Sequence, residues 1–370
     1  MNGRPSEQSR TEASTLVSYP LVSVVMPVWN EGSFIETSLG AVLAQTYPAD
    51  RLQVIVADGM STDGTRDKIR RLQSSHANLH LVDNPERIVS TGLNRAFPHA
   101  TGEVIIRIDG HCSIHPEYVA RCVRHLQSSE IDGVGGPIHT VGQGRVSSAI
   151  AAAMSSRFGV GGSLFRTGSA KSVLTDTVPF PAYTRKVMEE AGPYDEELVQ
   201  NQDDEYNYRI REMGGSLLLA SDVTSVYFSR ASFASLWRQY FGYGYWKVRV
   251  LQMHPRQMMP RQFVPALFLM ALLACAVIAP FVRPGAWPLV SLCSIYALAI
   301  LSASLFVSRG KGQASFPWVF VSFAVLHFSY GLGSLSGLIA FWHGWFVQAP
   351  GVGAKVSANK ASIYSEEGQA

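Results

Sequence analysis

Continuous apolar runs alternate with helix-like segments over the first hundred residues. Residues 21–28 (LVSVVMPV), 52–58 (LQVIVAD) and 103–109 (EVIIRID) read as strands that are covered on both faces, and residues 78–84 (NLHLVDN) as a shorter strand. The segments between them place apolar residues on one helical face. Strands that alternate with helices predict an α/β fold with a mostly parallel sheet.

The last third of the chain has a different pattern, with three apolar runs free of Lys, Arg, Asp and Glu. Each is long enough to cross the roughly 30 Å hydrocarbon core of a bilayer. Buried core helices are the alternative, but three successive uncharged runs favour a transmembrane region of about three helices over residues 261–342. Glycines 331, 333 and 337 predict that the last span is tilted or kinked. The runs are residues 263–282, 288–307 and 316–342.

Basic and aromatic residues flank these runs and predict an orientation. Residues 231–260 interleave Trp and Tyr with Arg and Lys, as in an amphipathic segment at a membrane interface. The excess of basic residues before the first run and after the second predicts a multi-pass membrane protein with residues 1–260 in the cytoplasm. Residues 1–19 and 343–370 are expected to be tails, the first one disordered.

Composition limits the choice of partners. The 370 residues carry a net charge of only +3, and 16% are charged, so no nucleic-acid-binding surface is indicated. The four cysteines form no CxxC pair, and we expect them to be reduced. The predicted domain of residues 20–230 is long enough to bury a core of its own.

Two carboxylates stand where predicted parallel strands end, the edge at which such sheets bind ligands. Asp58 ends the second strand and Asp109 the fourth. A carboxylate that follows a buried strand needs a nearby cation or several hydrogen-bond donors. His111 follows Asp109 by two residues. Imidazole suits Mn²⁺ better than Mg²⁺, so Asp109 and His111 are candidate ligands of a divalent metal, Mn²⁺ or Mg²⁺. The alternative is that His111 only hydrogen-bonds a phosphate or caps the following turn.

Four motifs in order resemble the family 2 glycosyltransferases with a GT-A fold, in particular the membrane-associated glucosyltransferases of succinoglycan-type exopolysaccharide assembly. The resemblance covers about residues 20–250. The motifs are VSVVMPVWNEGSFIETSL, VIVADGMSTDGTRDKI, GEVIIRIDGH and GPYDEELVQNQDDEYNYRIR.

This resemblance implies an inverting, metal-dependent enzyme. It would move a hexose, glucose from UDP-glucose, onto a polyprenyl-diphosphate-linked saccharide at the membrane. Other proteins of polysaccharide assembly are possible further partners. A metal in such a site neutralises the negative charge of the departing diphosphate.

The resemblance also implies roles for individual residues. Helix capping is the competing interpretation for Asn30 and Glu31, and Ser61, Thr62 and Asp63 are expected to form a turn. The residues implied in nucleotide or diphosphate binding are Pro27, Val28, Asn30, Glu31, Asp58, Arg87, Asn94 and Asp109.

For the catalytic base, the family pattern anchored on Arg209 places Asp203 at the position that deprotonates the acceptor, with Asp204 as the second candidate. Three consecutive acids could also be a solvated helix start. Gln239 lacks the Arg and Trp that follow the equivalent Gln in processive relatives, which favours addition of a single sugar. A processive synthase, a phosphohydrolase and a non-catalytic nucleotide-sugar-binding scaffold remain alternatives.

Overall fold

The structure is a computed structural model that describes residues 18–168, 171–281, 285–310 and 314–345. Most of the two predicted tails, residues 1–17 and 346–370, lies outside the described residues.

An eight-stranded sheet forms the centre of the N-terminal part, in the order β3-β2-β1-β4-β9-β6-β10-β8. The four strands β3, β2, β1 and β4 are mutually parallel, as the apolar pattern predicts. Beyond β4 the sheet is mixed, because β9 runs antiparallel to both β4 and β6. The strands are β1 Val22–Val28, β2 Leu52–Asp58, β3 Leu79–Asp83, β4 Val104–Arg107, β6 Gly133–Gly135, β8 Val173–Leu174, β9 Ala182–Thr184 and β10 Leu217–Leu219.

A second, three-stranded sheet joins distant parts of the chain. Strand β11 pairs antiparallel with β5 and parallel with β7. It thereby places residues 225–228 beside the segment that follows β4. Its strands are β5 Cys112–Ile114, β7 Ile138–Val141 and β11 Ser225–Phe228.

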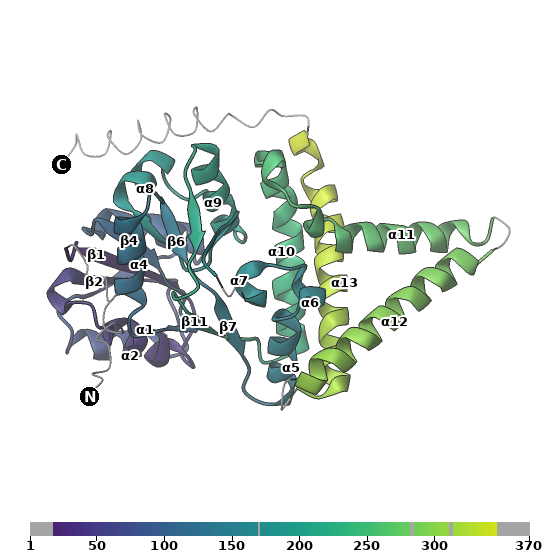
Figure 1. Cartoon of the computed structure of the whole chain (residues 1–370), viewed down its shortest axis with the longest axis horizontal. Helices are drawn as coiled ribbons and strands as arrows, with labels where there is room; N and C mark the ends of the chain where they lie inside the picture. The colour runs from purple at the N-terminus through teal and green to yellow at the C-terminus, as the bar shows by residue number, and fades with distance from the viewer. Residues whose placement is uncertain (1–17, 169–170, 282–284, 311–313, 346–370) are drawn as a thin grey trace, which may run out of the picture.

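The described part of the chain contains thirteen α-helices, of which α11, α12 and α13 lie away from the sheets (Figure 1). Five short 3₁₀ turns lie at residues 49–51, 97–99, 255–257, 260–262 and 342–345. The helices are α1 Ile35–Leu43, α2 Thr65–Gln73, α3 Val89–Ala96, α4 Tyr118–Ser128, α5 Arg145–Met154, α6 Arg157–Val160, α7 Leu164–Thr167, α8 Arg185–Ala191, α9 Gln202–Glu212, α10 Phe233–Met253, α11 Val264–Ile278, α12 Trp287–Gly310 and α13 Phe316–Ala340.

The parallel strands read as continuous apolar runs because both faces of the sheet are covered. Alternate residues of each strand point to opposite faces. Val24 and Val56 join one core cluster with side chains of α1, α2 and α4. Val25 and Ile55 join the other cluster with side chains of α3, α8 and α9. No face of these central strands is left to water, so the sheet positions its carboxyl edge rigidly.

Helices α10 and α13 run side by side between the sheet domain and the α11–α12 hairpin (Figure 1). Glycines permit this close approach. A Cβ on Gly333 would lie 2.0 Å from the Phe241 carbonyl oxygen, and one on Gly244 would lie 2.1 Å from that of Tyr330. The glycines for which the sequence predicts a tilted or kinked span lie within α13, which runs without interruption from residue 316 to 340, and they form a packing face.

Two helices in the described part of the chain are long and apolar enough to cross a membrane by length and composition, α12 and α13. The first predicted span, residues 263–282, contains the 15-residue helix α11 instead of a helix of twenty residues. Pro265 and the proline at position 280 bracket this helix in the sequence and limit its length. In α12 the most apolar window is 11% buried, against 44% in α13, because α13 packs against α10.

Candidate active site

Hydrogen bonds join the loops that follow β1 and β2. The Asn30 backbone N–H donates to Ser61 Oγ at 2.8 Å, and Asn30 Oδ1 accepts from the Thr62 N–H at 2.9 Å. The Gly32 N–H donates to Asp63 Oδ2 at 2.8 Å. Asn30 therefore links two loops and does not cap α1, whose N-cap position makes no side-chain hydrogen bond. Its left-handed backbone, with φ of 53°, is one that asparagine tolerates.

Asp58 ends β2 with its side chain fully buried. Ser61 donates to this carboxylate through its backbone N–H at 3.0 Å and its hydroxyl at 2.5 Å, and Arg66 Nη1 donates at 2.7 Å. Arg66 Nη2 also contacts Asp83 Oδ1 at 2.7 Å. These partners compensate the burial of the carboxylate. Asp58 thus holds the loop after β2 in place, and its contact with a nucleotide base stays a prediction.

The end of β1 lies against the loop that carries Asp109 and His111. A Cβ on Gly110 would come within 2.9 Å of both Val28 Cγ1 and Glu31 Cγ, so only glycine allows the two segments to approach this closely. The nucleotide candidates Pro27, Val28 and Glu31 are thereby placed beside the metal candidates. Their predicted ligand contacts remain to be tested.

Arg107 joins the two carboxylates on which the predicted chemistry depends. Its side chain, at the end of β4, is 9% exposed. Nη2 lies 3.0 Å from Asp109 Oδ1, and Nη1 lies 3.8 Å from Asp203 Oδ2 on α9. We call Arg107, Asp109 and Asp203 the Arg107 cluster. Two acids almost a hundred residues apart in the sequence therefore share one guanidinium.

The acids of this cluster have opposite electrostatic environments. Burial alone would raise the pKa of Asp109, but the charges of Arg107 and His111 lower it below its usual range. For Asp203, the loss of hydration together with the negative charges of Asp204 and Asp109 outweighs Arg107 and raises the pKa. Asp203 is also the more exposed side chain, at 44% against 21% for Asp109. A partly exposed carboxylate with a raised pKa is suited to accept a proton.

His111 is oriented by a carboxylate. Its Nδ1 lies 2.8 Å from Glu31 Oε1, and its ring meets the Tyr227 ring edge-on with the centroids 5.0 Å apart. Burial alone would lower the pKa of His111, but Tyr227, Glu31 and Asp109 together raise it to about 9. The Glu31 side chain is thus a partner of the histidine, while its backbone carbonyl accepts hydrogen bonds from the N–H groups of Phe34 and Ile35 at the start of α1.

Asp109 and His111 can hold a metal ion only if the substrate supplies most of its other ligands. In the described part of the chain, no group of three or more His, Cys, Asp or Glu side chains is arranged to hold a metal ion. Asp109 and His111 offer one oxygen and one nitrogen. Metal-binding histidines commonly donate their second ring N–H to a carboxylate, as His111 can to Glu31. When the metal displaces the proton from the other ring nitrogen of His111, this pair can hold a cation whose shell is completed by phosphate oxygens and water.

The three consecutive acids at the start of α9 have three different environments. Asp203 belongs to the Arg107 cluster. Asp204 forms an ion pair with Lys247 of α10 and accepts a hydrogen bond from Thr177 Oγ1 at 3.1 Å. Glu205 is 2% exposed. The alternative of a solvated helix start therefore does not describe Asp204 and Glu205, whereas the Asp203 side chain is 44% exposed.

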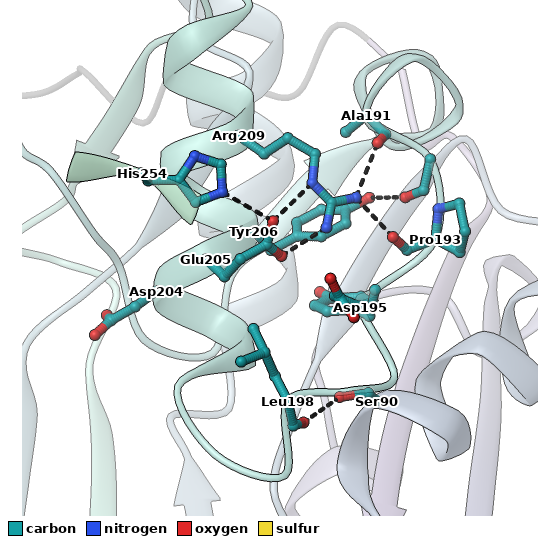
Figure 2. A network of polar contacts seen from close by, with 12 residues as sticks. Ser90, Ala191, Pro193, Asp195, Leu198, Asp204, Glu205, Tyr206, Arg209 and His254 are labelled. Atoms are coloured by element: carbon teal, nitrogen blue, oxygen red, sulfur yellow. Dashed lines mark hydrogen bonds and ion pairs between the residues drawn. The ribbon is translucent and has the colours of Figure 1, made fainter. Parts of the chain in front are cut away.

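Glu205 is the centre of a network of hydrogen bonds and ion pairs, and Figure 2 shows its contacts with Arg209 and His254. Arg209 donates to its two oxygens at 3.0 and 2.6 Å, and His254 Nε2 lies 3.2 Å from Oε1. The other ring nitrogen of His254 lies 2.9 Å from Glu212. Arg209 also donates to the backbone carbonyls of residues 191 and 193. We call Glu205, Arg209, His254 and Glu212 the Glu205 network.

Arg87 and Asn94, the remaining diphosphate candidates, lie on or before α3. Arg87 has a left-handed backbone, with φ of 62°. Asn94 is engaged in bracing a loop: its Nδ2 donates to the Tyr194 carbonyl at 2.9 Å and to Glu196 Oε1 at 2.8 Å, and its Oδ1 accepts from the Tyr194 N–H. Both implied ligand contacts stay predictions.

The structure adds basic and aromatic residues that the motif analysis missed. Gln239 Nε2 donates to the hydroxyls of Tyr227 and Tyr243 at 3.1 and 3.0 Å, and its Oε1 lies 3.3 Å from Arg230 Nε. Arg166 of α7 lies over the Tyr227 ring, 5.4 Å from its centroid. Arg230, two residues after β11, thus contacts Gln239, although no arginine stands at the expected offset after Gln239 in the sequence. The aromatic-rich FGYGYWK segment was the available signal.

Comparisons with known proteins identify the family and the fold of this chain. Residues 23–191 match the model of glycosyl transferase family 2. The succinoglycan biosynthesis protein ExoA of Rhizobium meliloti is 31% identical over 326 residues, which cover 86% of this chain and 95% of ExoA. The chain belongs to glycosyltransferase family 2. The glycosyltransferase AglE of Haloferax volcanii is 28% identical over 62% of this chain and 74% of AglE.

A solved structure confirms the fold. The mannosyltransferase of Pyrobaculum calidifontis, in complex with GDP-mannose and Mn²⁺, superposes with a TM-score of 0.56 at 22% identity, covering 86% of this chain and 88% of that one. This family 2 enzyme therefore has the predicted GT-A fold. Membership of a family of glycosyltransferases decides against the phosphohydrolase and the non-catalytic scaffold.

Proposed function

We propose that this family 2 enzyme transfers one hexose, with inversion, from a UDP-sugar to a lipid-linked saccharide at the cytoplasmic face of a bacterial inner membrane. Glucose from UDP-glucose is the proposed donor, a polyprenyl-diphosphate-linked saccharide the acceptor, and exopolysaccharide assembly the setting. The similarity to a succinoglycan biosynthesis protein supports the setting. The observation that carries the proposal is the Arg107 cluster.

The cluster supports a division of roles between its acids. The acceptor hydroxyl oxygen attacks the anomeric carbon while the bond from that carbon to the diphosphate oxygen breaks, and Asp203 takes the hydroxyl proton. Arg107 holds Asp203 and Asp109 in a fixed relation. Asp204 is the weaker candidate for the base, because Lys247 already neutralises it.

A divalent cation held by Asp109 and His111 would neutralise charge on the departing diphosphate. Glu31 fixes the orientation of the His111 ring, and Gly110 brings this ring close to the end of β1. Mn²⁺ in the solved mannosyltransferase supports a metal of this kind.

Membrane attachment is proposed through the C-terminal helices. Exposed apolar side chains lie along both α11 and α12, for example Leu267, Leu273, Ile295 and Leu298. Their hairpin projects away from the sheet domain (Figure 1). The 24 residues of α12 extend about 36 Å at 1.5 Å per residue, enough to span a bilayer. A lipid-linked acceptor would then approach the site along the α10 side.

The test is a transfer assay with the full chain in membranes, using lipid extract as acceptor. UDP-glucose, UDP-galactose and GDP-mannose are tested as donors in separate reactions with Mn²⁺, Mg²⁺ or EDTA. The masses of the products are measured by mass spectrometry. We expect addition of one hexose from UDP-glucose, lost in EDTA. A ladder of products from one donor would instead identify a processive synthase, and transfer from GDP-mannose alone would overturn the proposed donor.

A further inference from the structure

Helix α13 is long and apolar enough to cross a membrane, but it packs along α10, a helix that is bound to the sheet domain. Lys247 and Arg249 of α10 form ion pairs with Asp204 and Glu197 of that domain. Polar contacts with the domain extend from residue 239 to residue 254, about 22 Å of chain at 1.5 Å per residue. Charged groups and the domain that carries them are excluded from hydrocarbon by the cost of desolvation. The axis of α10 therefore lies along a bilayer surface and not through the bilayer.

The two ends of α13 are attached to the two ends of α10. At the start of both helices, the rings of Phe233 and Trp318 have centroids 6.0 Å apart. At their ends, Gln252 Nε2 donates to the backbone carbonyl of Phe341 at 2.7 Å. Helix α13 therefore follows the direction of α10, and both of its ends lie at the same surface.

The middle of α13 contacts the sheet domain as well. His327 lies at the middle of the helix, and its Nε2 is 2.9 Å from the backbone carbonyl oxygen of Phe158 in α6. The two rings also meet edge-on, with centroids 4.9 Å apart. If α13 crossed a bilayer, this contact would place α6, with the exposed side chain of Arg157, near the centre of the hydrocarbon. The hydropathy of α13 therefore does not make it a membrane span.

The exposed apolar residues of α13 lie on one face. Trp318, Leu332 and Ile339 are exposed, and their positions differ by multiples of seven, which brings them to the same side of a helix. The opposite side is buried against α10. One face toward protein and one apolar face outward is the distribution expected for a helix that lies in the plane of a membrane surface.

The α11–α12 hairpin has the properties of a membrane insert. Figure 1 shows that it leaves α13 crosswise, on the side away from the sheets. On its inner side, Phe268 and Tyr296 contact the ring of Phe328. Toward its tip, Phe281 and Trp287 are 83% and 67% exposed. A hairpin normal to the plane of α10 and α13 enters the lipid when these two helices lie on the lipid surface.

We propose that only the α11–α12 hairpin enters the bilayer, while α10 and α13 lie side by side on its cytoplasmic surface. This inference rests on the membrane attachment in the proposed function. Its partner is the lipid bilayer, whose acyl chains surround the hairpin and cover the exposed face of α13. Both ends of α13 then stay on the side of the catalytic domain, whereas a spanning α13 would have its ends on opposite sides.

The test is the sidedness of single cysteines in the full chain in bacterial membranes. Cys275→Ala and Cys293→Ala remove the two cysteines of the hairpin, and the other two are buried. New cysteines are introduced at exposed positions before α10, before α13 and after α13, as Ser232→Cys, Ser315→Cys and His343→Cys. A membrane-impermeant maleimide is added to spheroplasts and, separately, to inside-out vesicles, and labelling is normalised to that of detergent-solubilised protein. Ser232→Cys is the matched control that reports the side of the catalytic domain.

We expect all three cysteines to react in inside-out vesicles and to lose this reaction in spheroplasts. If Ser315→Cys and His343→Cys react from opposite sides, α13 spans the bilayer and the inference is overturned, while membrane attachment stands. Recovery of the chain in the soluble fraction would overturn the proposed membrane attachment and this inference with it. Labelling needs no turnover, so failure of the proposed transfer reaction leaves the result interpretable. If His343→Cys does not accumulate in membranes, Trp345→Cys reports the same end of α13.

Discussion

The Arg107 cluster and the Glu205 network both contain residues from the first turn of α9, yet they differ in exposure and in pairing. In the Arg107 cluster one guanidinium serves two carboxylates, and Asp203 remains 44% exposed. In the Glu205 network every carboxylate has a close basic partner, and Glu205 and His254 are almost completely buried. Incomplete pairing leaves a group available to substrate, whereas complete pairing of buried charges holds elements together. Adjacent acids thus have separate roles.

Replacing Asp203 by Asn is expected to have the largest effect. Asparagine keeps the size of the side chain and removes its ability to accept the acceptor proton. We expect kcat to fall by about 10²–10⁴-fold, while UDP-sugar binding and the thermal unfolding midpoint stay near the wild-type values, because the side chain is partly exposed. Measurements of kcat and of UDP-sugar binding on the same preparation of Asp203→Asn check this prediction. Full turnover by Asp203→Asn would exclude Asp203 as the base, and Asp204→Asn would then be measured next.

Replacing Glu205 by Gln tests the other half of this comparison, the structural role of the Glu205 network. It leaves Arg209 buried without the carboxylate of Glu205 and His254 with Glu212 as its remaining carboxylate, a change that costs about 3–5 kcal/mol of unfolding free energy. The kcat of the molecules that remain folded should change little. Thermal or denaturant unfolding measures the loss, and active-site titration corrects kcat for folded enzyme. If Glu205→Gln abolished transfer without destabilising the protein, the structural role of the network would be wrong.

The Glu205 network also gives a pH dependence. Burial alone would lower the pKa of His254, but Glu205 and Glu212 raise it above the ordinary 6.5. Burial alone would raise the pKa of Glu205, but His254 and Arg209 lower it below the ordinary 4.5. The contribution of His254 to stability is therefore complete below pH 6.5 and is lost as the pH rises through its folded pKa. The contribution of Glu205 is complete above pH 4.5 and is lost as the pH falls through its folded pKa.

We therefore expect the stability difference between wild type and His254→Gln to be largest between about pH 4.5 and 6.5 and to shrink at higher pH. Unfolding of both proteins across pH 4–9 measures it. A difference that grows toward pH 9 would contradict the protonated state of His254. Tyr208, whose ring centroid lies 6.4 Å from that of His254, is uncharged throughout this range and is not expected to contribute.

The parallel half of the fold was predictable because its signals are local. Each of the four strands is a nearly continuous apolar run, and Asp58 and Asp109 stand at or just after strand ends in the sequence as in the structure. Both faces of β1, β2 and β4 are buried, so the apolar pattern alone identifies these three strands, whereas β3 at the edge of the sheet is partly exposed. The likeness of the motifs to family 2 then gave the GT-A fold.

The separation of the three acids on α9 was not predictable, because distant residues decide it. Lys247 and His254 lie on or after α10, more than forty positions along the chain, and they neutralise Asp204 and Glu205. Hydropathy alone also predicted the last two apolar runs, residues 288–307 and 316–342, as membrane spans of the same kind. Packing of glycines in α13 against α10 separates them, and this contact depends on a partner helix that hydropathy does not identify.

The smallest loss of unfolding free energy is expected when the Arg249–Glu197 ion pair is broken, because this bidentate pair is more exposed than Arg209–Glu205. Arg249 donates to the two oxygens of Glu197 at 2.8 and 2.9 Å, much as Arg209 does to Glu205, but the Glu197 side chain is 44% exposed. Water can solvate both charges when the pair is broken. Glu197→Gln should therefore cost about 1 kcal/mol or less, and salt should reduce even this difference. Unfolding of Glu197→Gln and Glu205→Gln in parallel, at low and high salt, compares one bidentate pair in two environments. Equal losses in both variants would mean that burial is not what separates the two sites, and the distinction drawn between adjacent acids of α9 would lose its physical basis.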